Sequence, residues 1–180
     1  ELKPEYVGFV FAKSRRQITK EHAVTLRRYL DPEIQAVGVF VNELPAIVAG
    51  YLEEGVIDLA QLHGNESEEY IHSLRFRTGG ELIKAFSIKT REDVEKAKKS
   101  SADYILLDHG KGGTGELFDW SLIRNMDRPY FLAGGLNAEN VEQAILQTHP
   151  FAVDISSGVE TDGVKDPKKI TECIRRIRHV

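Results

Sequence analysis

The residues best suited to acid–base chemistry in this chain come directly after short apolar runs. Asp108 follows the run Tyr104–Leu107 without an intervening residue. A carboxyl group that is partly desolvated at such a point holds its proton more tightly, as a general acid requires. The alternative interpretation is an ordinary aspartate that caps the loop.

Glycine-rich and serine-rich segments follow the last two apolar runs. Gly134 and Gly135 come after Tyr130–Ala133, and Ser156, Ser157 and Gly158 come after Phe151–Ile155. Glycines let backbone N–H groups approach an anion closely, and a helix N-terminus beyond them adds a favourable dipole. One glycine pair would indicate only a tight turn, but two such loops together predict a phosphate site.

Two further polar candidates follow earlier runs. Arg15 and Arg16 lie beyond Val7–Phe11, and the planar fork of an arginine can clamp a carboxylate or a phosphate. His63 follows Leu59–Leu62 and could polarise a substrate oxygen. The alternatives are a solvated basic turn for the arginines and a hydrogen bond to a neighbouring loop for the histidine.

The single cysteine of the chain, Cys173, is spaced with Ile170, Ile174 and Ile177. This spacing predicts a buried structural cysteine on a helix rather than a nucleophile. One cysteine excludes an intramolecular disulfide, so a reducing, cytoplasmic location is expected. The six histidines show no metal-binding spacing, so no metal is expected.

Seven apolar runs would have to position these residues. They begin about 24 residues apart, between Val7 and Phe151. Helical patterns lie between them, with start signals at Thr19, Pro45, Thr90, Asn137 and Asp166 and a weaker pattern at Phe118–Arg124. Strands that alternate with helices predict a parallel sheet covered by helices, either an open doubly wound sheet or a closed (β/α)8 barrel.

The number of runs separates these two folds. A barrel needs eight strands, and eight units of this length would take about 192 residues, more than the 180 of the chain. The sequence therefore predicts either an open seven-stranded sheet or a barrel whose first βα unit is absent. No linker or low-complexity tract divides residues 1–180, which are expected to form one domain.

Composition excludes several other classes of protein. The net charge of −4 argues against the basic face that nucleic-acid binding usually needs, so no nucleic-acid partner is expected. No apolar run reaches the length of a membrane span, and the chain does not open like a signal peptide. A small-molecule ligand remains the expected partner.

Taken together, the strand-end sequences resemble the phosphoribosylanthranilate isomerase family of tryptophan biosynthesis, from about Tyr6 to the C-terminus. The matching segments occur in one order: Val-Gly-Phe-Val-Phe-Ala-x-Ser-x-Arg, Gly-Val-Phe-Val-Asn, Gln-Leu-His-Gly, Leu-Leu-Asp, Gly-Gly-Thr-Gly-x-x-Phe-Asp-Trp, Ala-Gly-Gly-Leu-Asn and Val-Asp-Ile-Ser-Ser-Gly-Val-Glu. The resemblance implies a (β/α)8 TIM barrel with its first βα unit absent from these residues. It also implies an Amadori rearrangement of N-(5-phosphoribosyl)anthranilate to 1-(2-carboxyphenylamino)-1-deoxyribulose 5-phosphate, with no cofactor.

The resemblance also implies roles for the candidate residues. Asp108 matches the general acid, and Arg16 matches the residue that meets the anthranilate carboxylate. His63 and Asp154 match polar positions at the barrel mouth, and Gly112–Gly115 matches a loop that closes over the substrate. The phosphate cradle is matched by Gly134, Gly135, Ser156, Ser157 and Gly158.

One departure from the family leaves other functions open. The family's general base is a cysteine in a Lys-x-Cys-Gly motif on the first strand, and this sequence has no such motif. A non-catalytic, truncated phosphate-binding relative is therefore one alternative. Another is a sister barrel enzyme of the pathway, indole-glycerol-phosphate synthase or the tryptophan synthase α chain, although Gln-Leu-His-Gly points away from both. Fusion to, or association with, a neighbouring pathway enzyme is compatible with the resemblance.

Overall fold

The computed structural model describes residues 2–109, 119–123 and 126–180. From residue 3 onward the chain divides into two compact units. The first comprises Lys3–Ala85 and Ser100–Asp103, and the second comprises Phe86–Lys99 and Tyr104–Val180. The predicted glycine loop at Gly112–Gly115 lies outside the described residues.

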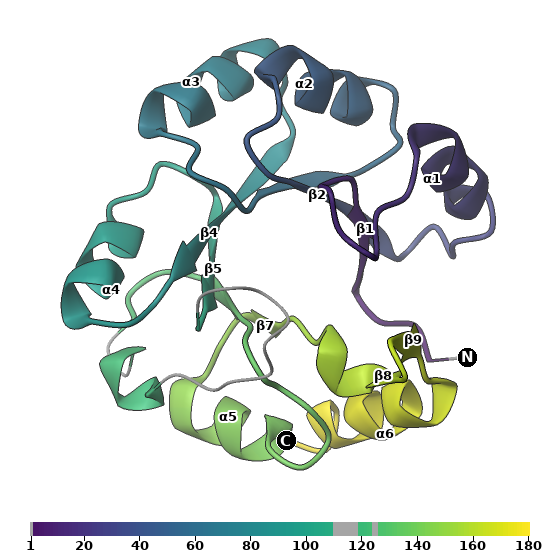
Figure 1. Cartoon of the computed structure of the whole chain (residues 1–180). Helices are drawn as coiled ribbons and strands as arrows, with labels where there is room; N and C mark the ends of the chain where they lie inside the picture. The colour runs from purple at the N-terminus through teal and green to yellow at the C-terminus, as the bar shows by residue number, and fades with distance from the viewer. Residues whose placement is uncertain (1, 110–118, 124–125) are drawn as a thin grey trace. The chain divides into compact units, whose positions relative to one another are not determined.

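The first unit alternates strands with helices, as the sequence predicts. Its elements are β1 (Tyr6–Val10), α1 (Lys20–Arg27), β2 (Gln35–Phe40), α2 (Pro45–Glu53), β3 (Leu59–Leu62), α3 (Glu68–Arg77) and the start of β4 (Glu81–Ser87). These strands pair in chain order and all in parallel, so their carboxyl ends share one edge. The helices α1, α2 and α3 cover one face of the strands (Figure 1).

Local sequence signals explain where these helices begin. The side chain of Thr19 accepts a hydrogen bond from the N–H of His22, and Pro45 opens α2. Ser67 caps α3 by accepting from the N–H of Tyr70. The helix α3 was not predicted, because its amphipathic pattern is weak: Phe76 within it is 94% exposed.

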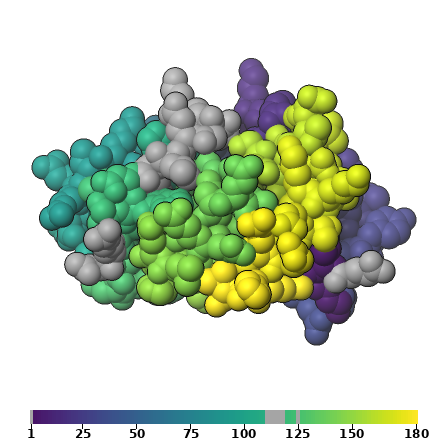
Figure 2. Space-filling view, turned by 90° about the horizontal axis from the view of Figure 1, so that it is seen from below, coloured from purple at the N-terminus to yellow at the C-terminus, as the bar shows by residue number. Residues whose placement is uncertain are grey.

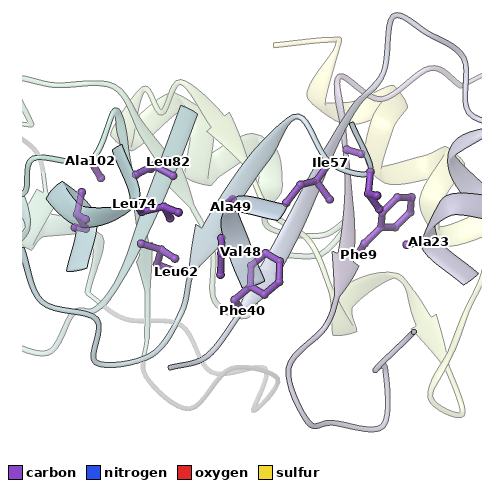
Figure 3. Packing of buried hydrophobic residues seen from close by; sticks show 14 residues of the cluster. Phe9, Ala23, Phe40, Val48, Ala49, Ile57, Leu62, Leu74, Leu82 and Ala102 are labelled. Carbon is purple, nitrogen blue, oxygen red and sulfur yellow. The ribbon is translucent and has the colours of Figure 1, made fainter. Parts of the chain in front are cut away.

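Buried side chains from the strands and helices form the core of the first unit. The cluster extends from Phe9 near Ala23 of α1, through Phe40 near Val48 of α2, to Leu74 of α3 near Leu82 of β4 (Figure 3). Burial of one large apolar side chain stabilises a fold by about 2 kcal/mol, so this core holds the strands firmly in register. The loops at their carboxyl ends therefore start from fixed points.

The second unit repeats the same pattern and adds a short hairpin. Its elements are α4 (Arg91–Lys98), β5 (Tyr104–Asp108), η1 (Trp120–Ile123), β6 (Tyr130–Leu132), α5 (Val141–Thr148), β7 (Ala152–Val153), η2 (Ser157–Val159), β8 (Glu160–Thr161), β9 (Val164–Lys165) and α6 (Pro167–Ile177). The strands β5, β6 and β7 pair in parallel, whereas β8 and β9 are antiparallel. The helices α5 and α6, green and yellow, lie side by side (Figures 1 and 2).

Of the three helix starts that the sequence predicts in the second unit, two are confirmed and one is wrong. Thr90 and Asp93 form the predicted capping box, and Asp166 caps α6. The residue that caps α5 is Asn140 rather than Asn137. The carboxamide oxygen of Asn137 instead accepts from the N–H of Glu139, inside a turn that precedes the helix.

Other predicted boundaries shift by a few residues. The weak helical pattern at Phe118–Arg124 is a short 3-10 helix over Trp120–Ile123, and its two predicted end residues lie outside the described part of the chain. The predicted strand Phe151–Ile155 shortens to Ala152–Val153. The hairpin of β8 and β9 was not predicted. It turns through Asp162 and Gly163, both of which have positive φ.

The fold is thus a parallel α/β arrangement, which confirms the predicted class. Within the described ranges, no helix has the length and apolar character needed to span a bilayer.

Candidate active site

The acid candidate Asp108 is the last residue of β5 and is only 7% exposed. Its Oδ1 atom accepts a hydrogen bond of 2.7 Å from the N–H of His109. The burial that the sequence predicts for this carboxyl group is therefore confirmed. Its place at the carboxyl end of β5 is the position at which the sequence predicts a proton donor.

Gly134, beyond the end of β6, lies against this carboxyl group. A Cβ atom at this position would lie 2.7 Å from Oδ1 of Asp108 and 2.9 Å from the backbone nitrogen of His109. Its φ of +86° is in the left-handed region, which favours glycine. Glycine at this position thus allows the loop after β6 to approach the acid closely.

The two predicted phosphate loops meet in the second unit. A Cβ atom on Gly158 would overlap the carbonyl oxygen of Leu136 and would lie 2.9 Å from Cβ of Asn137. Gly135 also has a positive φ, of 65°, and its carbonyl accepts from Nδ2 of Asn140. The loop after β6 and the loop after β7 therefore pack backbone against backbone.

A lysine that the sequence analysis did not single out supports the second of these loops. The Nζ atom of Lys165 donates to the carbonyl of Ser156 at 2.8 Å and lies 3.3 Å from Oε1 of Glu160. Ser156 has φ −107° and ψ −81°, outside the regular helix and strand regions. Ser157 and Gly158 then begin the 3-10 helix η2. Lys165 lies on β9, in the hairpin that the sequence did not predict.

Asp154 directly follows β7 and is exposed. Its backbone N–H donates to the carbonyl of Leu132 at 2.8 Å, which continues the pairing of β6 with β7. Asp154 therefore stands at the same strand edge of the second unit as Asp108 and Gly134.

Arg16 and His63 belong to the first unit, each beyond the carboxyl end of a strand. Arg16 is half-buried and its backbone N–H donates to Oγ of Ser14, whereas the neighbouring Arg15 is exposed. The Nδ1 atom of half-buried His63 lies 2.8 Å from Nε2 of Gln61. With the amide nitrogen of Gln61 as donor, His63 carries its proton on Nε2 and can donate it to a ligand oxygen.

Glu66 and Lys84 form a buried ion pair below the His63 loop that the sequence analysis also missed. Burial by itself would raise the pKa of Glu66. Hydrogen bonds from the N–H of Asn42 and from the Lys84 ammonium group outweigh this and lower the pKa. Glu66 is therefore a carboxylate at neutral pH.

Cys173 is buried in α6, as its spacing predicts. Burial, followed by the nearby charge of Glu172, raises the pKa of its thiol. Both features are typical of a structural cysteine. Within the described residues, no three His, Cys, Asp or Glu side chains cluster in a way that could hold a metal ion.

A parallel α/β fold with an acid and glycine-rich loops at the carboxyl ends of its strands is found in TIM-barrel enzymes and in doubly wound α/β enzymes. The family model of N-(5′-phosphoribosyl)anthranilate (PRA) isomerase matches residues 1–176. The chain belongs to this family.

Named relatives support the assignment. The N-(5′-phosphoribosyl)anthranilate isomerase of Thermoanaerobacter pseudethanolicus is 45% identical over 186 positions, which cover 100% of this chain and 90% of the relative. The crystal structure of phosphoribosyl anthranilate isomerase from Thermotoga maritima has a TM-score of 0.90 and 40% identity, and the match covers 99% of this chain and 90% of that one.

One related structure contains a ligand. It is a phosphoribosyl anthranilate isomerase in complex with reduced 1-(o-carboxyphenylamino)-1-deoxyribulose 5-phosphate. Its TM-score is 0.87 at 38% identity, and the match covers 99% of this chain and 90% of that one.

Proposed function

We propose that this protein catalyses the Amadori rearrangement of N-(5′-phosphoribosyl)anthranilate to 1-(2-carboxyphenylamino)-1-deoxyribulose 5-phosphate, a step of tryptophan biosynthesis. The observation that carries the proposal is the family match over residues 1–176. The related isomerase that holds the reduced product supports the same substrate class, a phosphorylated sugar joined to an aromatic acid.

Asp108 is the proposed general acid. It donates its proton to the ring oxygen of the ribose, the C1–O bond breaks, and a Schiff base forms between C1 and the anthranilate nitrogen. A base then removes the proton from C2 to give an enolamine, which tautomerises to the ketone. The burial of Asp108 and its contact with the Gly134 loop support this role.

The phosphate of the substrate is proposed to bind where the loops after β6 and β7 meet. The residues that would cradle it are Gly134, Gly135, Ser156, Ser157 and Gly158. The close packing of the two loops, which leaves no room for a side chain at Gly158, supports this proposal. Lys165 holds the backbone of this second loop through its bond to the carbonyl of Ser156.

Three further side chains are proposed to bind the rest of the substrate. Arg16 meets the anthranilate carboxylate through its guanidinium fork, and its half-burial favours it over Arg15. His63 donates from Nε2 to a substrate oxygen, and Asp154 contributes a polar group at the end of β7.

The resemblance to the family implies a cysteine as the general base, and the one cysteine of this sequence, Cys173, is buried in α6 and does not suit that role. We propose that the seven parallel strands correspond to strands two to eight of a (β/α)8 barrel whose first βα unit is absent from residues 1–180. On this proposal residues 1–180 are an N-terminally incomplete single domain. The matched relatives, of which this chain covers about nine tenths, support it. We further propose a cytoplasmic location.

Loss of substrate fluorescence tests the activity, with the intact mass of the same preparation measured alongside. We expect turnover from a protein heavier than 20.3 kDa, and a drop on the order of a hundredfold or more in Asp108→Asn. Turnover by a protein of 20.3 kDa would exclude a base outside this sequence. A heavier protein that binds the product analogue without turnover would instead be a non-catalytic phosphate-binding relative.

A further inference from the structure

A buried ion pair lies directly below the loop that carries His63. The Nζ atom of Lys84 lies 2.9 Å from Oε2 of Glu66, and their side chains are 6% and 1% exposed. Nζ also donates to the carbonyls of Leu62, at 3.3 Å, and Gly64, at 2.8 Å. The three protons of the ammonium group thus reach both neighbours of His63 in the chain.

Glu66 ties the same loop to the loop that follows β2. Its Oε1 atom accepts from the N–H of Asn42 at 2.7 Å, and its Oε2 atom accepts from the N–H of Gly64 at 2.9 Å. The Oδ1 atom of Asn42 in turn accepts from the N–H of Asn65 at 2.8 Å. We call the set of Asn42, Gly64, Glu66 and Lys84 the clasp.

The clasp is closely packed. A Cβ atom on Gly64 would overlap Oδ1 of Asn42 and would lie 2.8 Å from Oε1 of Glu66. Asn42 itself has a φ of +52°, a conformation that asparagine tolerates better than most residues. Neither loop can shift without breaking hydrogen bonds in the other.

Stability alone is a weak reason for a buried ion pair, because apolar residues of similar size often stabilise a fold as well or better. This pair fixes the backbone on either side of His63. His63 lies between the two carbonyls that Lys84 binds, and its own N–H donates to the carbonyl of Phe40 at 2.8 Å. Gln61 then sets its ring through Nδ1.

We propose that Glu66 and Lys84 are positioning residues that hold His63 in place for the ligand. The inference rests on the proposed function, in which His63 donates to a substrate oxygen. Because both side chains are almost fully buried, we expect their effect on binding to pass through His63.

The test compares two carboxylates that flank β3. Glu66→Gln keeps the shape of the side chain and removes the charge at the carboxyl end of the strand. Asp58→Asn is the matched control at the amino end, where Asp58 accepts from the N–H of Ala36 at 2.7 Å and pairs with Arg27 at 2.9 Å. The probe is reduced 1-(o-carboxyphenylamino)-1-deoxyribulose 5-phosphate, measured by calorimetry on the full protein.

We expect Glu66→Gln to weaken binding of this probe by about tenfold and Asp58→Asn by less than about twofold. In the His63→Ala background, Glu66→Gln should weaken binding of the probe by less than about a further twofold. The effects of two substitutions are not additive when one residue acts through the other. Equal losses from Glu66→Gln and Asp58→Asn, or a full loss in both backgrounds, would overturn the inference. If Glu66→Gln fails to fold, Asn42→Gly removes only the bond to Asn65 and should weaken binding by a smaller factor.

A measurement without ligand separates this inference from the proposed function. The imidazole ¹⁵N signals of His63, assigned through His63→Ala, report the protonation and hydrogen bond of Nδ1. Glu66→Gln should shift them and Asp58→Asn should not. Failure of the wild-type protein to bind the probe would contradict the proposed function alone, whereas unchanged His63 signals in Glu66→Gln would contradict the positioning role alone.

Discussion

A Cβ atom on Gly134 would lie 2.7 Å from Oδ1 of Asp108, so the loop after β6 and the buried acid at the end of β5 cannot both keep their places if residue 134 has a side chain. The predicted change is Gly134→Ala, which adds this steric clash to the strain of a positive φ. We expect turnover to fall by about tenfold or more because the acid is displaced.

The control for Gly134→Ala is Gly55→Ala. Gly55 also has a positive φ, of 68°, but a Cβ atom there meets nothing within 4 Å. Urea unfolding should show a cost of about 1 kcal/mol for Gly55→Ala and a larger one for Gly134→Ala. Normal turnover in Gly134→Ala would show that the contact with Asp108 has no catalytic consequence.

Gly158→Ala tests the contact between the two proposed phosphate loops. The new methyl group would overlap the carbonyl of Leu136, so the two backbones must separate. We expect inorganic phosphate to lose most of its ability to compete with the product analogue. The control is Gly79→Ala, where a Cβ atom has open space. In this variant inorganic phosphate should compete as well as it does in the wild type. If inorganic phosphate competed equally well in Gly158→Ala, the phosphate would have to bind elsewhere.

Arg16→Ala separates recognition of the carboxylate from recognition of the phosphate. Loss of the guanidinium fork should weaken binding of the product analogue by about tenfold and change the affinity for inorganic phosphate little. Arg15→Ala, next to it and exposed, should leave both affinities near the wild-type values. Calorimetric titration of both ligands measures this. Equal losses for the two ligands in Arg16→Ala would count against a role at the carboxylate.

The buried Glu66 predicts a specific dependence of stability on pH. Its pKa is held below the ordinary 4.5. As the pH falls, Glu66 therefore takes up its proton in the unfolded chain at a higher pH than in the folded protein. The stability that Glu66 contributes is complete above that value and is lost at lower pH.

The measurement is the free energy of unfolding in urea between about pH 6 and pH 3, for the wild type and for Glu66→Gln. The wild type should lose more stability over this range than the variant, because the variant has no proton to take up at residue 66. Parallel curves would contradict a lowered pKa for Glu66.

Features that depend on neighbouring residues in the chain were predictable from the sequence. The strand Leu59–Leu62 is found with its predicted bounds, and Thr19, Thr90 and Asp166 cap helices through bonds that reach only two or three residues ahead. Asn137 and Asn140 differ in this respect. Both are asparagines, and the turn between them, rather than the residue type, decides that α5 begins after Asn140.

Features that depend on strand register were not predictable. Glu66 and Lys84 are far apart in the sequence and meet because β3 pairs with β4 such that Leu62 is opposite Lys84. The contact of Gly158 with Leu136 depends likewise on how two loops pack. By contrast, the candidate residues Asp108, Gly134 and His63 could be found because each directly follows a recognisable strand.

The burial of Cys173 leaves the chain with no reactive thiol of its own at the surface. The side chain of Asn65 is exposed, and Asn42 of the clasp binds only the backbone N–H of that residue. A cysteine introduced at position 65 would therefore offer a dye an exposed thiol without breaking the clasp. A dye attached there, two residues from His63, would report ligand binding optically, with the unsubstituted protein labelled alongside to account for the thiol proposed to lie on the absent strand.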